Sequence, residues 1–355
     1  MPMGGYRAPG WLPGRGALGG NAQTIWPALW SRRHLGPRPR FVRERWSTPD
    51  GDFIDLDWLD AAAPAPDPAP ASVPAPAPAR PRAAGAGRPL LVLFHGLEGS
   101  SASHYALAFA DEARRRGWDA VVPHFRGCSG ELNLAPRAYH SGDHEEIGWI
   151  LARLRARHAA AGPLFAVGVS LGGNALLRWA EEQGEAAAAV AQGVAAISAP
   201  LDLAAGGRAI GEGFNRLVYT RMFLRTMKPK ALRKLAQHPG LFDRERLLAA
   251  RDLYAFDDVF TAPLHGFRGT DDYWARGSAR PHLARIRVPA LVLNARNDPF
   301  VPACSLPRPD EVGRRVRLWQ PAHGGHVGFP DGAPRGHVLT LPRRVMDWLA
   351  APDLA

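Results

Sequence analysis

Residues 168–173 read Gly-Val-Ser-Leu-Gly-Gly, and this short stretch decides the fold. The apolar run at 164–169 is typical of a buried strand, and residues 171–182 are rich in Ala and Leu, as a helix would be. A serine at a sharp turn from strand to helix projects its hydroxyl at the edge of a sheet, and flanking glycines let strand and helix approach closely. The bare pattern is common by chance, but this setting favours a functional one. The stretch therefore predicts Ser170 as a catalytic nucleophile.

Strand and helix signals alternate on both sides of this turn. The clearest helix is predicted over 143–158, where Ile147, Ile150, Leu151 and Leu154 form one apolar face. Strands are expected at 89–94, 120–123, 164–169, 194–198, 290–294 and 316–319, and further helices at 105–115, 171–182 and 343–349. Strands separated by helices predict an α/β fold with a mostly parallel, doubly wound sheet.

The N-terminal part of the chain has a different pattern. Apolar and polar residues alternate over 41–48 and again over 53–59, on either side of the turn Pro49-Asp50-Gly51. Alternation on both sides of a strong turn predicts an N-terminal antiparallel hairpin. Residues 61–88 consist largely of Ala and Pro, which bury little and remove backbone donors, so we expect a disordered, exposed loop there. The whole chain, 1–355, is expected to form a single domain.

A helical segment at about 200–280 interrupts the alternation of strands and helices. A helical insertion between two core strands is the usual place for a cap over an active site, and we expect a cap here. Basic residues are interleaved with apolar ones in this segment: Arg216, Arg221, Arg225, Lys228, Lys230, Arg233 and Lys234. This basic run is either a solvated helix face or a surface for peripheral contact with anionic lipid headgroups or acidic substrates. The sequence leaves both interpretations open.

A nucleophilic serine needs a base within hydrogen-bond reach and an acid that orients the base. In a site of this kind they follow along the chain in the order serine, acid, histidine. Asp298 comes just after the strand predicted at 290–294, so it is the candidate acid. Asp271 and Asp272 are rival acids, but they do not directly follow a core strand.

Two histidines, His323 and His326, come after the last predicted strand. One of them should be the base. A pair of histidines three residues apart also fits metal binding, but no second cluster of His, Asp or Glu offers the remaining ligands at a recognisable spacing. We therefore expect no metal and no cofactor.

The oxyanion that forms during attack on a carbonyl needs backbone N–H donors. In such sites one donor belongs to the residue after the nucleophile and the other to a loop that follows an early strand. These positions correspond to Leu171 and to Leu97 in the loop 95–99. Gly96 permits the tight turn that aims the Leu97 N–H. His95 is expected to support this loop rather than to act as the base.

Several short motifs outside the turn point to a known family. They are Asn21-Ala22-Gln23-Thr24, His95 to Gly99, Phe125 to Glu131, Tyr139 to Asp143, Gly168 to Asn174, Asn297-Asp298-Pro299 and Gly324 to Phe329. Together they resemble the YheT-like α/β-hydrolases, the family that also includes the ABHD1/2/3-type esterases and lipases, over most of residues 20–345. The resemblance implies a helical cap, a triad of Ser170, Asp298 and His326, and hydrolysis of carboxylic esters with lipid-like or short- to medium-chain acyl groups.

Two other hypotheses use the same residues. The second hypothesis is an acyltransferase, in which the acyl group on Ser170 passes to an alcohol instead of water. The sequence does not distinguish this reaction from hydrolysis. Binding without catalysis is the third hypothesis, and a complete triad in the right order argues against it. Nearby residues are given structural roles: Arg126 should tie loops together, Asp143 should cap a helix, and Cys128 should pack as a small residue in a turn.

Composition narrows the remaining function classes. The net charge is +11, but the arginines are spread along all 355 residues and no nucleic-acid motif occurs, so no nucleic-acid partner is expected. Two cysteines imply no disulfide framework. The first residues lack a secretory pattern, and no apolar run approaches the roughly 18–20 residues that span a bilayer. We expect a cytoplasmic enzyme with a small-molecule ester substrate and infer nothing about its oligomeric state.

Overall fold

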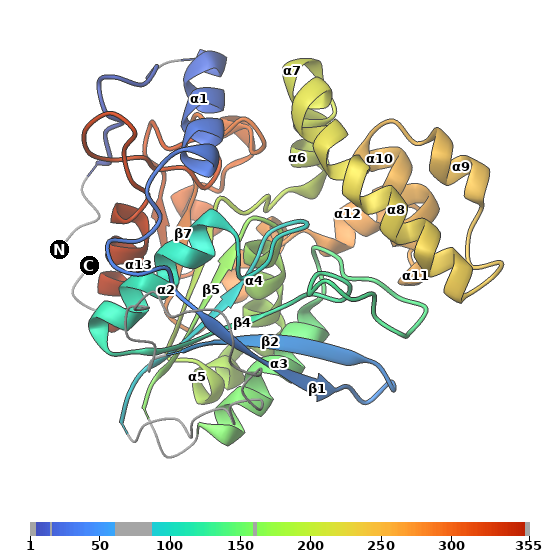
Figure 1. Ribbon diagram of the computed structural model, residues 1–355, viewed down its shortest axis with the longest axis horizontal. Coiled ribbons are helices and arrows are strands. Elements are labelled where there is room, and N and C mark those ends of the chain that lie inside the picture. Colours follow the sequence, from blue (N-terminus) through green and yellow to red (C-terminus); the bar gives the residue numbers. More distant parts are fainter. Residues whose placement is uncertain (1–4, 15, 61–86, 159–161, 352–355) are drawn as a thin grey trace, which may run out of the picture.

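The structure is a computed structural model that describes residues 5–14, 16–60, 87–158 and 162–351. Of the loop predicted at 61–88, residues 61–86 lie outside the described residues. Within the described part, eight strands form one sheet in the order β1-β2-β4-β3-β5-β6-β7-β8 (Figure 1). β2 runs antiparallel to β1 and β4, and the other pairs are parallel. This confirms the predicted α/β fold with a mostly parallel sheet and an N-terminal hairpin.

The observed strands lie almost where the sequence predicts them. They are β1 (Phe41–Ser47), β2 (Phe53–Leu59), β3 (Leu90–Phe94), β4 (Asp119–Pro123), β5 (Leu164–Val169), β6 (Gly193–Ile197), β7 (Ala290–Leu293) and β8 (Val316–Trp319). Phe41 pairs with Leu59 and Ser47 with Phe53, so β1 and β2 form the hairpin around the turn at 49–51. β3 is buried along its whole length, as expected of a strand covered on both faces.

The helices predicted between the strands are also present. The core helices are α2 (His104–Arg116), α3 (His144–Arg157), α4 (Leu171–Gln183), α5 (Ala187–Val190) and α13 (Thr340–Ala350), with the short turns η1 (Gly184–Ala186), η4 (Arg280–Arg285), η5 (Ala303–Ser305) and η6 (Pro309–Glu311). Asp143 accepts a hydrogen bond from the Glu146 N–H, which confirms that it caps α3. The patterns in the sequence do not predict the N-terminal helix α1 (Gly16–Leu29). No helix in the described ranges is long and apolar enough to cross a membrane.

Residues 200–280, called the helical insertion below, lie between β6 and β7. They form α6 (Leu203–Ile210), α7 (Gly213–Asn215), η2 (Arg216–Thr220), α8 (Arg221–Gln237), α9 (Arg244–Ala249), α10 (Leu253–Phe256), η3 (Asp257–Thr261), α11 (Ala262–Leu264) and α12 (Thr270–Gly277). Figure 1 shows these yellow and orange helices gathered on one side of the molecule. They have an apolar cluster of their own around Leu247, Phe256 and Phe260. The predicted helical insertion is therefore present between β6 and β7.

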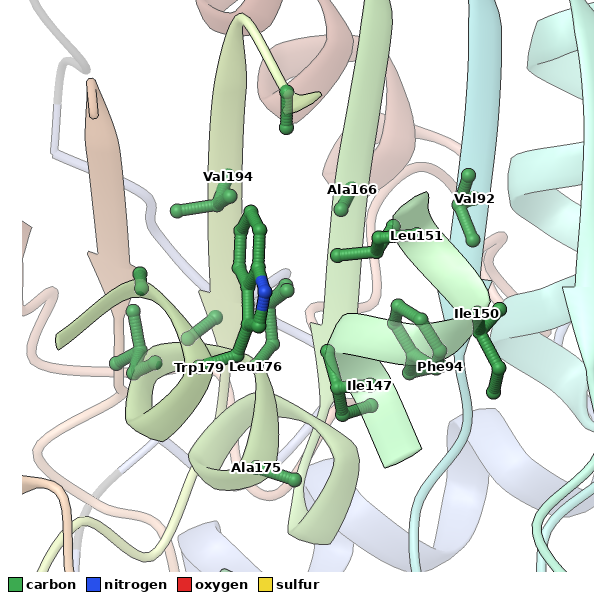
Figure 2. Close-up of a cluster of buried hydrophobic side chains, with 14 of the residues drawn as sticks. Val92, Phe94, Ile147, Ile150, Leu151, Ala166, Ala175, Leu176, Trp179 and Val194 are labelled. Carbon is green, nitrogen blue, oxygen red and sulfur yellow. The ribbon is translucent and has the colours of Figure 1, made fainter. Parts of the chain in front are cut away.

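Side chains alternate between the two faces of the sheet. Val92 and Phe94 of β3 belong to one apolar cluster with Ile147 of α3 and Trp179 of α4, and Figure 2 shows Trp179 beside Val194 of β6. Leu91 of the same strand belongs to a second cluster, which includes side chains of α2 and α13. Each such side chain contributes about 2 kcal/mol when it is removed from water. Burial on both faces thus fixes β3 and β5, whose ends carry the candidate site.

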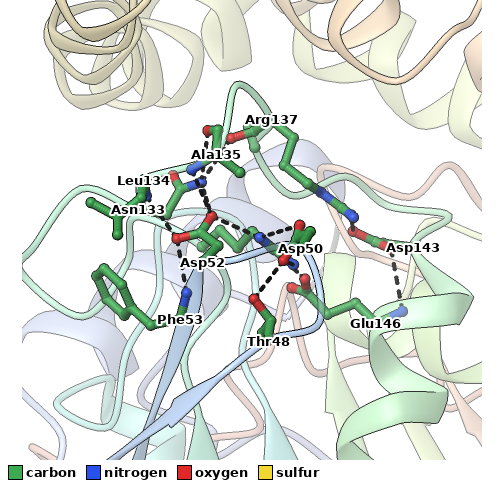
Figure 3. Close-up of polar contacts among 12 residues, drawn as sticks. Thr48, Asp50, Asp52, Phe53, Asn133, Leu134, Ala135, Arg137, Asp143 and Glu146 are labelled. Carbon is green, nitrogen blue, oxygen red and sulfur yellow. Dashed lines mark hydrogen bonds and ion pairs between the residues drawn. The ribbon is translucent and has the colours of Figure 1, made fainter.

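Arg126 ties the hairpin turn to α3. Its guanidinium donates to the carboxylates of Glu146 at 2.6 Å and Asp52 at 2.7 Å. Asp52 also accepts hydrogen bonds from the Asn133 side chain and from two backbone N–H groups beyond it (Figure 3). Burial by itself would raise the pKa of Asp52, but these bonds lower it to about 2. The loop-tying role predicted for Arg126 is confirmed.

Candidate active site

Ser170 lies at the turn between β5 and α4, with a φ of 52° and a ψ of −120°. A positive φ is costly for a residue that carries a Cβ, so this turn is strained. Glycine is needed on both sides of it. A Cβ on Gly168 would lie 2.4 Å from the Gly172 carbonyl oxygen, and a Cβ on Gly172 would lie 2.5 Å from the His95 carbonyl oxygen. The predicted close approach of strand and helix is therefore present.

The structure brings His326 and Asp298 to the serine from two separate loops. His326 Nε2 lies 3.0 Å from Ser170 Oγ, and His326 Nδ1 lies 2.9 Å from Asp298 Oδ2. The other carboxylate oxygen accepts a hydrogen bond from the Phe300 N–H at 2.8 Å, which holds the acid in place. The Asp298 side chain is fully buried, and that of His326 is 10% exposed. This arrangement can activate a serine through a histidine that a carboxylate orients.

The rival candidates lie elsewhere. His323 is half-buried near Gly14 and does not line the pocket that contains Ser170. Asp271 and Asp272 lie on α12 of the helical insertion, where Asp272 pairs with two arginines and Asp271 accepts from a tyrosine hydroxyl. Among the described residues, no three or more His, Cys, Asp or Glu side chains gather where they could hold a metal ion.

Two segments bring the candidate oxyanion donors beside Ser170. Leu171 opens α4, so its N–H is one of the first helical donors, which have no partner within the helix. Leu97 lies in the loop after β3, and both leucines line the same pocket as Ser170. A Cβ on Gly96 would lie 3.1 Å from the Ser170 Cβ, so this loop packs against the nucleophile. The Tyr105 hydroxyl, a residue that the sequence patterns do not single out, accepts the Gly96 N–H at 2.9 Å.

His95 supports the loop, as expected. Its Nε2 accepts the Phe125 N–H at 3.1 Å, and its Nδ1 donates to the Gly96 carbonyl at 2.8 Å. Complete burial, and then the neighbouring His124, lower its pKa to about 3. His95 is therefore neutral at pH 7 with both ring nitrogens engaged, and it is not available as a base.

Helix α1 clamps the loops of the acid and the base. Gln23 Oε1 accepts the Gly324 N–H at 2.8 Å and the Asn297 side chain at 3.1 Å. The Thr24 hydroxyl accepts the His326 N–H at 2.8 Å. In the sequence these two residues belong to a motif that carries a family resemblance but no role. Only the structure assigns them to the site.

A pocket of about 1150 Å³, measured out to its open mouth, contains Ser170 and His326. Loops of the sheet and helices of the insertion share its walls. Its large apolar lining residues are Leu97, Leu132, Leu171, Leu203, Ile210, Phe223, Met227, Leu253, Phe256, Phe260 and Phe300. The Phe300 ring lies over His326, with 4.2 Å between the ring centroids. The site therefore offers a largely apolar space next to the serine, and charged side chains such as Glu98, Lys230 and Asp257 also belong to its lining.

One ion pair joins the helical insertion to the candidate oxyanion loop. Lys230 Nζ of α8 lies 2.9 Å from Glu98 Oε1, and the Tyr139 hydroxyl donates to the same oxygen at 2.9 Å. The Glu98 N–H in turn donates to the Tyr139 oxygen at 3.0 Å. Cys128 is buried 3.7 Å from the ammonium, and burial raises the pKa of its thiol to about 11. Cys128 is thus a packed thiol in a turn, as expected.

The basic run of the helical insertion divides between interior and surface. Lys234 is almost fully buried and donates to the carbonyls of Asn133 and Ala135, while Lys230 reaches Glu98. The arginines near the start of α8 are exposed. Neither of the two interpretations of the basic run therefore describes all of it.

Comparisons with known proteins point to one family. A protein-family model described as "alpha/beta hydrolase fold" matches residues 89–333 of this chain. A protein named "Putative esterase YheT" from Escherichia coli (strain K12) is 39% identical over 340 residues, which are 95% of this chain and 92% of that protein. "Phospholipase ABHD3" from Mus musculus is 28% identical over 87% of this chain and 74% of its own length. The solved structure "Alpha/beta hydrolase domain-containing protein 10 from mouse" shares the fold, with a TM-score of 0.51 at 13% identity over 88% of this chain and 99% of that one.

Proposed function

This chain belongs to the α/β-hydrolase fold family, and from that premise we propose that it cleaves carboxylic esters through an acyl-enzyme on Ser170. The observation that carries the proposal is the line of contacts from Asp298 through His326 to Ser170, at 2.9 Å and 3.0 Å. The 39% identity with a protein named a putative esterase supports the same class of reaction.

The geometry supports a two-step reaction. Ser170 Oγ attacks the ester carbonyl carbon while His326 Nε2 accepts the hydroxyl proton. The Asp298 carboxylate orients the ring and stabilises the imidazolium, and the N–H groups of Leu97 and Leu171 hold the oxyanion. His326 then protonates the leaving alcohol, which departs and leaves the acyl group on the serine. In the second step His326 activates a water molecule, which releases the acid and restores Ser170.

The apolar pocket supports an acyl chain as the recognised part of the substrate. Phe223, Met227 and Phe256 of the helical insertion line it, so the insertion acts as a cap over the serine. Each buried methylene contributes about 0.8 kcal/mol, so kcat/KM should rise with chain length until the pocket is filled. We therefore assign lipid-like or short- to medium-chain acyl esters as substrates, and the name of the mouse relative, a phospholipase, is consistent with this class.

An acyltransferase is the second candidate, because an alcohol can replace water at the acyl-enzyme. Product partition separates the two reactions. With a p-nitrophenyl ester and added glycerol, an esterase releases mostly the free acid. A glycerol ester as the main product at millimolar glycerol would assign the protein as an acyltransferase.

Covalent labelling tests the proposed nucleophile. A fluorophosphonate probe should modify the wild-type protein, and peptide mass spectrometry should find the adduct on Ser170. The Ser170→Ala variant should not be labelled, while Ser47→Ala, which changes an exposed serine of β1, should be labelled like the wild type. Absence of labelling in the folded wild type would reject the proposal and leave the binding hypothesis. An adduct on another serine would reject Ser170 as the nucleophile.

The outer face of α7, η2 and α8 supports contact with an anionic lipid surface. Large apolar side chains are between 36% and 57% exposed along this face: Phe214, Leu217, Val218 and Met222. Arg221 and Arg225 are exposed beside them. Apolar residues with flanking arginines are typical of helices that lie in a lipid interface. Phe223 of the same helix lines the pocket, so docking on this face would bring the pocket close to lipid esters.

Vesicle sedimentation tests this contact. The protein should bind vesicles that contain phosphatidylglycerol more strongly than vesicles of phosphatidylcholine alone. Leu217→Glu should weaken the binding, and Leu248→Glu, which changes an exposed leucine of α9, should not. Equal binding by the two variants would reject this surface. If the wild type ran as a dimer in gel filtration and Leu217→Glu ran as a monomer, the face would instead bind a second copy of the chain.

A further inference from the structure

Glu98 has an unusual backbone conformation beside a residue of the proposed oxyanion hole. It follows Leu97 directly, and its φ is 56°. For a residue that carries a Cβ, this left-handed backbone conformation is roughly 1–2 kcal/mol less favourable than the common conformations. The loop therefore needs contacts that hold Glu98 in place, and a loss of those contacts allows it to relax.

Tyr139 provides the first of these contacts from the core. Its hydroxyl accepts the Glu98 N–H at 3.0 Å and donates to Glu98 Oε1 at 2.9 Å. The ring stacks on Phe125 with 5.3 Å between centroids and an interplanar angle of 11°, so its position is fixed. Burial raises the pKa of Tyr139 well above its ordinary value, which keeps the hydroxyl protonated as a donor.

Lys230 provides the second contact, and it comes from the helical insertion. Its ammonium lies 2.9 Å from Glu98 Oε1, across 132 residues of sequence. The side chains of Lys230 and Glu98 are only 32% and 10% exposed, so this pair is less screened than an ion pair on the surface. Burial alone would lower the pKa of Lys230, but its contacts with Cys128 and Glu98 raise it, so the ammonium stays charged.

A second lysine of the same helix docks it on the core without touching this loop. Lys234, one turn after Lys230, donates to the carbonyls of Asn133 and Ala135. Of these two lysines, Lys230 is the one that reaches the residue next to Leu97. Docking of α8 and the conformation of the oxyanion loop are therefore joined at a single ion pair.

We propose that Lys230 is a positioning residue that couples the docked helical insertion to the oxyanion hole through Glu98. With α8 docked, the ammonium holds the carboxylate, Glu98 keeps its left-handed backbone, and the Leu97 N–H stays aimed at the oxyanion. When α8 moves away, Glu98 loses one of its two partners and the loop relaxes. The inference rests on the proposed esterase function and adds that turnover depends on where the insertion lies.

Matched lysine variants test the coupling. Lys230→Met should lower kcat about thirtyfold and leave KM within about twofold, which is less than the roughly 10²–10³-fold cost of losing an oxyanion donor completely. Lys230→Arg, which keeps the charge, should recover most of the loss. Lys228→Met removes a charge from the same helix. Among the described residues Lys228 donates only to the Leu248 carbonyl, within the insertion, so this variant should behave like the wild type.

Affinity for a transition-state analogue separates positioning from a general structural role. A trifluoromethyl ketone with an alkyl chain adds to the serine and places an oxyanion in the hole. Its inhibition constant should rise in Lys230→Met by about the same factor as kcat/KM falls, while KM for the ester stays near that of the wild type. A fall in kcat/KM that comes from KM alone, or unchanged inhibition, would overturn the coupling.

Two further measurements keep the outcomes distinct. If Lys230→Met does not fold, Glu98→Gln replaces it, since this change removes the charge but keeps the shape and should give the same effect on kcat. If wild type hydrolyses esters and is labelled on Ser170, an unchanged kcat in both variants rejects the coupling and leaves the esterase proposal standing. If the wild type does neither, the esterase proposal itself fails.

Discussion

The sheet edge that carries Ser170 and the helical insertion that covers it are held together by different means. At the sheet edge, backbones touch: a Cβ on Gly328 would lie only 1.7 Å from the Gln23 carbonyl oxygen. In the insertion, Gly240 has no atom within 4 Å of such a Cβ. Because close-packed backbone leaves little room to move, we expect the base loop at Gly328 to be rigid. Long side chains such as Lys230 and Lys234 hold α8 on the core, so we expect α8 to be more adjustable.

Two carboxylates, Asp52 of the core and half-buried Asp257 of the insertion, differ in how well their charge is stabilised. Asp52, in the core, faces the guanidinium of Arg126 and several N–H donors, and its pKa falls to about 2. Asp257, in the helical insertion, accepts hydrogen bonds from the Trp274 indole and the Thr261 hydroxyl, and burial raises its pKa to about 6. The charge of Asp52 is therefore stabilised, whereas the charge of Asp257 carries a cost. The following predictions test how differently the two regions are held.

The largest effect is expected for the base. His326→Ala should lower kcat/KM for a p-nitrophenyl ester by about 10³-fold or more, because no other described residue is placed to accept the serine proton. His323→Ala is the matched control and should keep most of the activity, since His323 lies outside the pocket. Comparable activity in the two variants would overturn the assignment of His326 as the base.

The second prediction compares one substitution in the two regions. Gly328→Ala should destabilise the protein by about 3 kcal/mol or more, because its Cβ would overlap the Gln23 carbonyl and α1 would have to move. Gly240→Ala meets open space and should cost only about 1–2 kcal/mol, from its φ of 82°. Urea unfolding measures both values. Equal costs would show that the sheet edge is as adjustable as the insertion.

The sheet and the serine turn were predictable because their signals are local. A strand buried on both faces must be a short apolar run, and the turn at Ser170 needs glycines at fixed offsets. The clamp by Gln23 and Thr24 was not predictable, because it joins residues about 300 positions apart through hydrogen bonds. Hydrophobic periodicity carries no information about such contacts.

The inward lysines of the helical insertion show a second limit. Phe223, Met227, Lys230 and Lys234 are spaced to share one face of α8, and they all line the pocket. Hydropathy assigns the apolar pair to the interior and the lysines to solvent, so the sequence pattern predicts that the whole basic run lies on the surface. Lys230 points inward because it pairs with the carboxylate of Glu98, which lies on a loop far away in the sequence. The two residues come together only in the folded chain.

The third prediction uses the raised pKa of Asp257. Its carboxyl has a pKa of about 6 in the folded protein and about 4 when unfolded, so the folded state binds the proton more tightly and stability falls as pH rises through this window. Asp257→Asn removes the charge and should be about 2–3 kcal/mol more stable than the wild type at pH 8, with no gain at pH 4. Asp271→Asn, at an exposed aspartate of the insertion, should show no such gain. If the difference in stability between Asp257→Asn and the wild type were the same at pH 4 and at pH 8, the ionised Asp257 carboxylate would not destabilise the fold.

The smallest effect is expected at the clamp on the base. Thr24→Val keeps the shape of the buried side chain but removes the acceptor for the His326 N–H, and an unpaired N–H costs about 1–3 kcal/mol. The ring should then sample orientations away from Ser170, and kcat should fall about tenfold while KM changes little. Thr226→Val, at an exposed threonine of α8, should leave kcat unchanged. If the two variants had equal kcat, α1 would pack against the base loop without orienting it, and precise geometry at the sheet edge would come from the loop alone.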